Sequence, residues 1–108
     1  MALAKLVRKE LARFGDDSPE AVGHRLRAAR RVANVAVAEI VRSRRHGLDG
    51  AHVEAAEAGL ILPNYSLMSF YWQQLKLDSA FIEHGDLEVI PIEIEDDLFA
   101  ALTLQMGR

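Results

Sequence analysis

The hexapeptide GDDSPE, residues 15–20, contains the clearest helix start in the chain. Ser18 is suited to the N-cap position, because its hydroxyl can accept a hydrogen bond from a free backbone N–H of the first turn. Pro19 suits the first helical position, and Glu20 complements the positive end of the helix dipole. The next strong stop signal is Gly47, so the sequence predicts one long helix over residues 19–46.

This predicted long helix has one apolar side. Val22, Leu26 and Ile40 fall on one stripe, together with several alanines that allow another helix to approach closely. Hydrophobic spacing and capping signals predict four further helices, over residues 2–14, 50–58, 66–84 and 98–106. Asp49 is expected to cap the second of these, and Gly59 is expected to end it.

The segment EVIPIEIEDDL, residues 88–98, has a different pattern. Three isoleucines alternate with Pro91 and two glutamates, which predicts a β-strand that leads into a helix cap. A lone strand is not stable in water, so it needs a partner. Residues 60–62 of the same chain, a second copy of the chain and another protein are the three candidates. Pro91 lacks an N–H, which restricts the strand to a sheet edge.

The order of strand, acidic cap and helix in IPIEIEDDLFAAL resembles the start of a ribbon–helix–helix module. That module is a two-fold DNA-binding fold whose strands pair between subunits. In this chain Glu93 and Glu95 occupy the outward strand positions, where they would repel phosphate. The resemblance therefore does not assign the family.

The composition suits one small domain. The chain has 108 residues, of which 50% are hydrophobic and 27% are charged, as in ordinary globular proteins. The absence of cysteine excludes disulfides and thiolate metal sites, and it suits the cytoplasm. We predict one mainly α-helical domain over residues 1–108, a small bundle of four to five helices with one C-terminal β-strand. We expect oligomerisation to complete this bundle, with residues 86–108 as a candidate interaction arm.

Charge is distributed unevenly along the chain. Residues 1–47 contain 11 Lys and Arg against 5 Asp and Glu, whereas residues 48–108 contain 2 against 11. The split predicts either a basic surface for an acidic partner or two halves that attract each other. No apolar run approaches the roughly 18 residues that a membrane-spanning helix needs, so no membrane partner is expected.

The predicted helix over residues 66–84 is apolar around most of its circumference. A helix of this kind is usually buried on several sides, and in a chain with a small core this predicts contact with a second subunit. The alternating isoleucines of the predicted strand extend the same interface. The predicted interface consists of Phe70, Tyr71, Trp72, Phe81, Ile90, Ile92 and Ile94.

Four arginines are predicted to lie on the polar side of the long helix. Guanidinium groups bind phosphate well because they are always charged and donate two parallel hydrogen bonds. A helix carrying four of them can follow a nucleic-acid backbone, although a solvated face or a face paired with the acidic half is the simpler interpretation. The candidate nucleic-acid-binding residues are Arg27, Arg31, Arg42 and Arg45.

Signals for catalysis, cofactors and metals are weak. Glu54 and Glu57 share a helix face and could bind a divalent cation, but nothing else in the sequence requires it. Asp78 falls within an apolar stripe, so it is expected to be paired, hydrogen-bonded or near the rim, and a buried or semi-buried ion pair with Arg44 is the favoured interpretation. We therefore predict no catalytic, metal-binding or cofactor-binding residue.

Two functions from different classes remain after these arguments. The first is a non-enzymatic protein–protein interaction module or subunit that acts as a homo-oligomer, with a dimer favoured. The alternative is a nucleic-acid-binding regulator that uses the basic face of the long helix. The sequence leaves open which partner the chain binds and whether the predicted strand pairs within the chain or between subunits.

Overall fold

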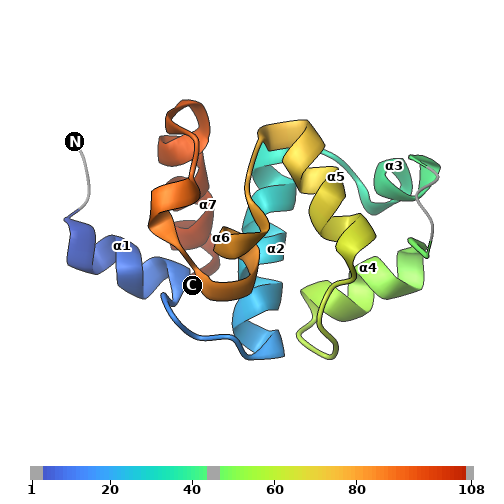
Figure 1. Cartoon of the computed structure of the whole chain (residues 1–108), viewed down its shortest axis with the longest axis horizontal. Helices are drawn as coiled ribbons and strands as arrows, with labels where there is room; N and C mark the ends of the chain where they lie inside the picture. The colour runs from blue at the N-terminus through green and yellow to red at the C-terminus, as the bar shows by residue number, and fades with distance from the viewer. Residues whose placement is uncertain (1–3, 44–46, 107–108) are drawn as a thin grey trace.

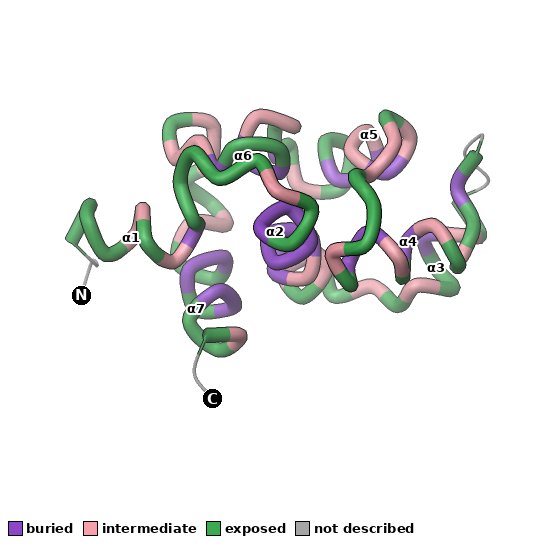
Figure 2. Tube along the Cα trace, turned by 90° about the horizontal axis from the view of Figure 1, so that it is seen from below, coloured by how far each residue is buried: buried purple, intermediate pink, exposed green. Residues whose placement is uncertain are grey.

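Helix α2, Pro19–Ala33, runs through the middle of the structure, and α4, α5, α6 and α7 all contact it (Figure 1). The structure is a computed structural model that describes residues 4–43 and 47–106. Figure 2 shows that α2 is buried along most of its length. The other α-helices of the described chain are α1 Lys5–Ala12, α3 Val37–Arg42, α4 Gly50–Glu57, α5 Tyr65–Leu75, α6 Ser79–His84 and α7 Glu95–Met106.

The helix starts follow from the predicted caps. The Ser18 hydroxyl accepts a hydrogen bond from the Ala21 N–H at 3.2 Å, with Pro19 at the first helical position. The Asp49 carboxylate accepts from the His52 N–H at 2.8 Å and begins α4. The prediction of a mainly helical fold is therefore confirmed, together with these two helix starts.

The single long helix predicted over residues 19–46 is wrong. Helix α2 ends at Ala33, because Asn34 adopts the left-handed conformation with φ 57°. The Asn34 N–H donates to the carbonyls of Arg30 and Arg31 and so completes the last turn. Asparagine tolerates this conformation better than most residues, so it can end a helix as glycine does. A separate short helix, α3, then begins at Val37.

The helix predicted over residues 66–84 is also divided in two. Lys76 adopts φ 57° at the end of α5, and Leu77 is fully buried beyond it. Asp78 then caps α6, where its carboxylate accepts from the Ala80 N–H at 2.9 Å. Asp78 is therefore an exposed cap residue and not the buried half of an ion pair. Its predicted partner, Arg44, lies outside the described residues.

The predicted C-terminal β-strand is not supported, since no strand occurs in residues 4–43 and 47–106. Two 3₁₀ turns, η1 Leu87–Val89 and η2 Ile92–Ile94, occupy this segment on either side of Pro91. The Asp86 carboxylate starts η1 by accepting from the Glu88 N–H at 2.9 Å. These turns interrupt the side-to-side alternation of side chains that a strand would have. Ile90 and Ile94 therefore pack against the core, whereas Ile92 is 81% exposed.

A fully buried arginine ties three segments together. Arg25 of α2 donates from Nε to the Ala12 carbonyl at 2.7 Å, and from Nη1 to the Ile82 carbonyl at 3.1 Å. Its Nη2 donates to the carbonyls of Arg13 and of Asp16. The acceptors lie at the carboxyl-terminal ends of α1 and α6 and in the connection to α2. Helix carboxyl ends carry partial negative charge, which favours a cation at this position. Burial lowers the pKa of Arg25 from its usual value.

A buried histidine joins α1 and α7 to the same helix. The Nε2 of His24 lies 2.9 Å from the Leu11 carbonyl, which can only accept, so Nε2 carries the proton. The side-chain amide of Gln105 donates to Nδ1 of His24 at 3.0 Å and to the His24 carbonyl at 2.9 Å. Burial lowers the pKa of His24, in keeping with this neutral form.

On the opposite side, α2 and α4 cross in close contact at Gly23. A Cβ atom on Gly23 would lie 2.7 Å from the Ala56 carbonyl oxygen and 2.8 Å from the Glu57 carbonyl oxygen. Beside this crossing, Glu57 and Arg30 form a bidentate ion pair. The Glu57 carboxylate accepts from Arg30 Nε at 2.7 Å and from Arg30 Nη2 at 3.0 Å. Glu57 is buried, so this pair aligns the two helices at a position from which water is largely excluded.

We predict that Gly23→Ala lowers the free energy of unfolding by roughly 2 kcal/mol, although alanine is the better helix former. The added methyl group would press on backbone atoms that cannot move without separating α2 from α4. Gly50→Ala is the matched control, because the nearest atom to its added Cβ is Val37 Cγ1 at 3.9 Å. We expect this control to be neutral or to gain up to about 1 kcal/mol. Urea unfolding followed by circular dichroism measures both changes, and equal effects would contradict the close crossing.

Candidate interaction surfaces

The residues predicted as an interface separate into core and surface. Phe70, Tyr71 and Phe81 are buried, and the rings of Phe70 and Tyr71 pack edge to face with centroids 5.3 Å apart. These three residues therefore build the core and are not on an open surface. Trp72 is exposed, with the Lys76 ammonium 5.4 Å from its ring centre, and Ile92 is exposed as well. Sequence periodicity could not separate these roles, because it did not show where α5 ends.

A hollow of about 380 Å³ lies between α1 and the segment over residues 87–95. A second hollow of about 350 Å³ continues it along α1 towards Phe14. The two hollows share Lys5, Leu87 and Glu88, and we call them together the α1 groove. The remaining lining residues are Arg8, Lys9, Phe14, Gly15, His84, Asp86, Ile90, Ile92 and Glu95.

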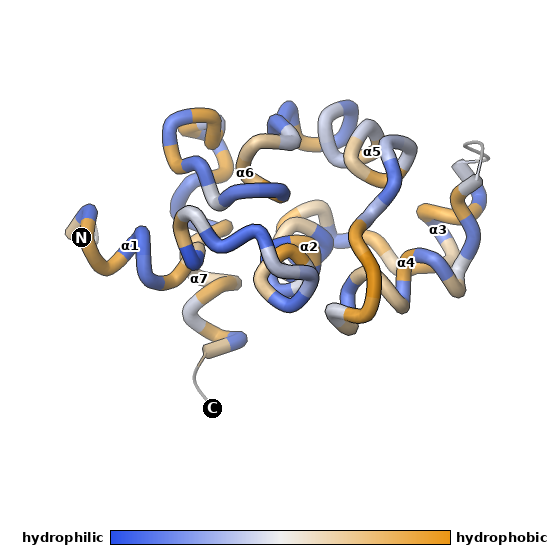
Figure 3. Tube along the Cα trace, turned by 60° about the horizontal axis from the view of Figure 1, so that its bottom comes forward, coloured by the Kyte–Doolittle hydropathy of each residue, from blue (hydrophilic) through white to orange (hydrophobic). Residues whose placement is uncertain are grey.

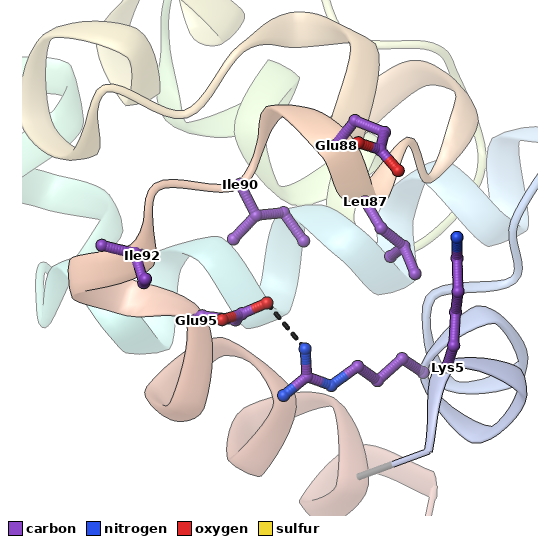
Figure 4. A pocket seen from close by; sticks show the side chains of 7 residues that line it. Lys5, Leu87, Glu88, Ile90, Ile92 and Glu95 are labelled. Atoms are coloured by element: carbon purple, nitrogen blue, oxygen red, sulfur yellow. Dashed lines mark hydrogen bonds and ion pairs between the residues drawn. The ribbon is translucent and has the colours of Figure 1, made fainter. Parts of the chain in front are cut away.

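The α1 groove has a basic wall on α1 and, on the C-terminal segment, a wall that combines apolar side chains with the carboxylates of Asp86 and Glu88. Leu87 and Ile90 point from the C-terminal segment towards α1, and Lys5 extends from α1 at the opposite rim (Figure 4). At the base, Arg8 donates to Glu95 at 2.7 Å, and its guanidinium lies 5.0 Å from the centre of the Phe99 ring. This ion pair fixes α1 against the start of α7, so the groove is a preformed feature of the fold.

The loop between α4 and α5 forms a separate apolar surface. Leu60 and Leu62 are exposed, as is Tyr65 at the start of α5. Figure 3 shows the part of this loop next to α4 as hydrophobic and the part that enters α5 as hydrophilic. The sequence suggested residues 60–62 as a strand partner, but the structure places them in a loop without strand pairing.

The three candidate nucleic-acid-binding arginines that the structure describes do not form one stripe. Arg27 donates to the Glu57 carbonyl across the α2–α4 crossing, so it has a structural contact. Arg31 is exposed near the end of α2, and Arg42 is exposed at the end of α3. Arg45 lies outside the described residues. The break at Asn34 therefore places Arg31 and Arg42 on different helices.

Helices α3 and α4 follow each other in the chain and pack together on one side of α2, where α4 contacts it (Figure 1). The exposed positions of α4 are Ala51 and Glu54, and Ala58 follows at its end. Arginine, lysine, asparagine and glutamine make most of the specific contacts to base edges. None of these residue types occurs in α4, so its outer face is poorly suited to reading a base sequence.

The structure gives no new support to a metal site or a catalytic site. Within residues 4–43 and 47–106, no three histidine, aspartate or glutamate side chains are grouped as metal ligands. Glu54 is exposed, whereas Glu57 is bound to Arg30, so the two carboxylates do not act as a pair. The Tyr71 hydroxyl is buried beside this ion pair, and burial raises the pKa of Tyr71. None of the described helices is both long and apolar enough to cross a membrane.

Comparison with protein-family models, with curated proteins and with solved structures finds no match to this chain. The function is therefore argued from the surfaces of the chain itself. Among these, the α1 groove combines a defined shape with side chains of complementary chemistry.

Proposed function

We propose that this chain is a non-enzymatic protein-interaction module that works as a homo-oligomer, with a dimer favoured. The observation that most directly supports the protein-interaction module is the α1 groove, where exposed Ile92 lies beside a preformed hollow. Burying an isoleucine side chain contributes about 2 kcal/mol, so leaving Ile92 in water forgoes a gain that a partner would recover.

The two walls of the α1 groove favour a protein segment as the partner. Leu87, Ile90 and Ile92 offer an apolar surface, while Lys5 and Lys9 project positive charge from α1. An amphipathic segment that carries leucine-like side chains and carboxylates matches both walls. The ion pair of Arg8 with Glu95 keeps the walls at a fixed separation, which lowers the ordering cost of binding.

We predict that peptides selected from a random display library on the immobilised full chain carry apolar residues next to aspartate or glutamate. Their affinity should fall at least about tenfold for Ile92→Glu, and also for Lys5→Glu, because each change removes one wall of the groove. Leu60→Glu is the matched control, since Leu60 is equally exposed but lies on the α4–α5 loop. Binding that responds only to Leu60→Glu would place the partner site on that loop instead.

Nucleic-acid binding is the second candidate, and one observation favours it. In helix–turn–helix DNA-binding domains two successive helices pack together, and α3 and α4 do so here, with α4 also in contact with α2. The exposed Arg42 at the end of α3 would then contact phosphate. The alanines and Glu54 on the outer face of α4 make this the weaker proposal.

We expect no mobility shift of mixed-sequence duplex DNA or of single-stranded RNA at physiological salt. The physical reason is that the described part of the α3–α4 surface presents Arg42 among alanines and the carboxylates of Glu39 and Glu54. A shift that weakens steeply with added salt and disappears in Arg42→Glu would favour the nucleic-acid function instead. Lys76→Glu, a charge reversal on the exposed end of α5, is the control for nonspecific charge effects.

A further inference from the structure

A second groove, of about 270 Å³, lies between α2 and α7 on a surface separate from the α1 groove. Its lining consists of Arg31 and Val32 from α2 and of Asp97, Ala100, Ala101 and Leu104 from α7. We call it the α2–α7 groove. Leu104 is 65% exposed, and the small side chains of Ala100 and Ala101 line the groove with it.

Two opposite charges flank the α2–α7 groove. Arg31 and Asp97 are both exposed, and neither forms an ion pair with another described residue. They come from different helices and lie at the same groove as the apolar Leu104 and Ala100. The groove therefore carries the unpaired cation Arg31, the unpaired anion Asp97 and the exposed apolar side chain of Leu104.

We infer that the α2–α7 groove is the surface on which a second copy of this chain docks. In a two-fold dimer every contact occurs twice, so the surface must be complementary to itself. An unpaired arginine and an unpaired aspartate meet this requirement, because Arg31 of each copy can pair with Asp97 of the other. Leu104 of each copy then packs on the alanines across the two-fold axis. This inference rests on the proposed homo-oligomer and names the surface that forms it.

The charge pattern also distinguishes a second copy from other occupants. A nucleic acid would meet Arg31 but would be repelled by Asp97 and by the neighbouring Asp96. A strongly acidic or strongly basic protein segment would be opposed by one of the two charges. A copy of the same chain, turned by two-fold symmetry, matches both.

Sedimentation velocity of the full chain over a concentration series tests this inference. We expect a dimer for the wild type, and at least about tenfold weaker dimerisation for Leu104→Lys, Arg31→Asp and Asp97→Arg. The double variant Arg31→Asp/Asp97→Arg should regain an affinity within about threefold of the wild type, because the exchanged charges can pair again.

Two controls separate docking from folding. Asp97 also lies in the acidic first turn of α7, so reversing its charge disturbs the start of the helix. Asp96→Arg produces the same disturbance outside the groove and should leave dimerisation unchanged. Ile92→Glu, in the α1 groove, should also leave it unchanged. Thermal melts of each variant confirm that the chain is folded.

The outcomes distinguish the inference from the proposed function. A wild-type dimer that is insensitive to Leu104→Lys, or single reversals that the double variant does not rescue, would overturn the α2–α7 groove as the dimer surface. The proposed homo-oligomer would survive that result. A wild type that stays monomeric throughout the concentration series would overturn both.

Discussion

The burial of Arg25 in the middle of α2 is the constraint on which the rest of the fold depends. A buried cation is costly unless its donors are satisfied, and here the partners are backbone carbonyls of Ala12, Arg13, Asp16 and Ile82. No side-chain carboxylate bonds to the guanidinium among the described residues. The carboxyl-terminal ends of α1 and α6 must therefore meet at one point on α2. Gly85 completes this junction, because a Cβ there would lie 2.9 Å from the Ala12 carbonyl oxygen and 3.1 Å from Arg25 Nε.

Helix α2 uses its other buried positions to hold elements on both of its sides. His24 joins α1 and α7 through Leu11 and Gln105, whereas Gly23 lets α4 approach on a different side. These polar and steric requirements occupy several sides of α2, although Arg31 stays exposed near its end. The surfaces that remain open then lie at the borders between elements, where α1 meets the 87–95 segment and where α2 meets α7. We propose the α2–α7 groove for self-association and the α1 groove for another protein.

Sequence reasoning succeeded where a signal was local and failed where tertiary contacts decided. Ser18 and Asp49 cap helices as predicted, because capping depends on residues within one turn. The breaks at Asn34 and Lys76 were missed, since neither residue is a strong stop signal. In both cases the apolar pattern of the sequence continues beyond the end of the helix. The isoleucine alternation predicted a strand, but without a neighbouring strand to pair with, Pro91 and the Asp86 cap favour 3₁₀ turns. The predicted interface residues separate in the structure: Ile92 is exposed, whereas Phe70, Tyr71 and Phe81 fill the core, and the interface itself stays a prediction. No pattern in the sequence indicated the role of Arg25, apart from the position of this arginine on the inner side of a helix.

The free energy of unfolding of Arg25→Met tests this account most directly. Methionine fills much of the arginine volume, so the main loss is the set of hydrogen bonds to the carboxyl ends of α1 and α6. The account predicts a loss of at least about 3 kcal/mol in urea unfolding, because four backbone carbonyls, two of them in buried hydrogen bonds, lose the guanidinium as a donor at once. Arg42→Met, on the exposed end of α3, should change the value by no more than about 0.5 kcal/mol. A loss below about 1 kcal/mol for Arg25→Met would show that the fold does not depend on this buried cation.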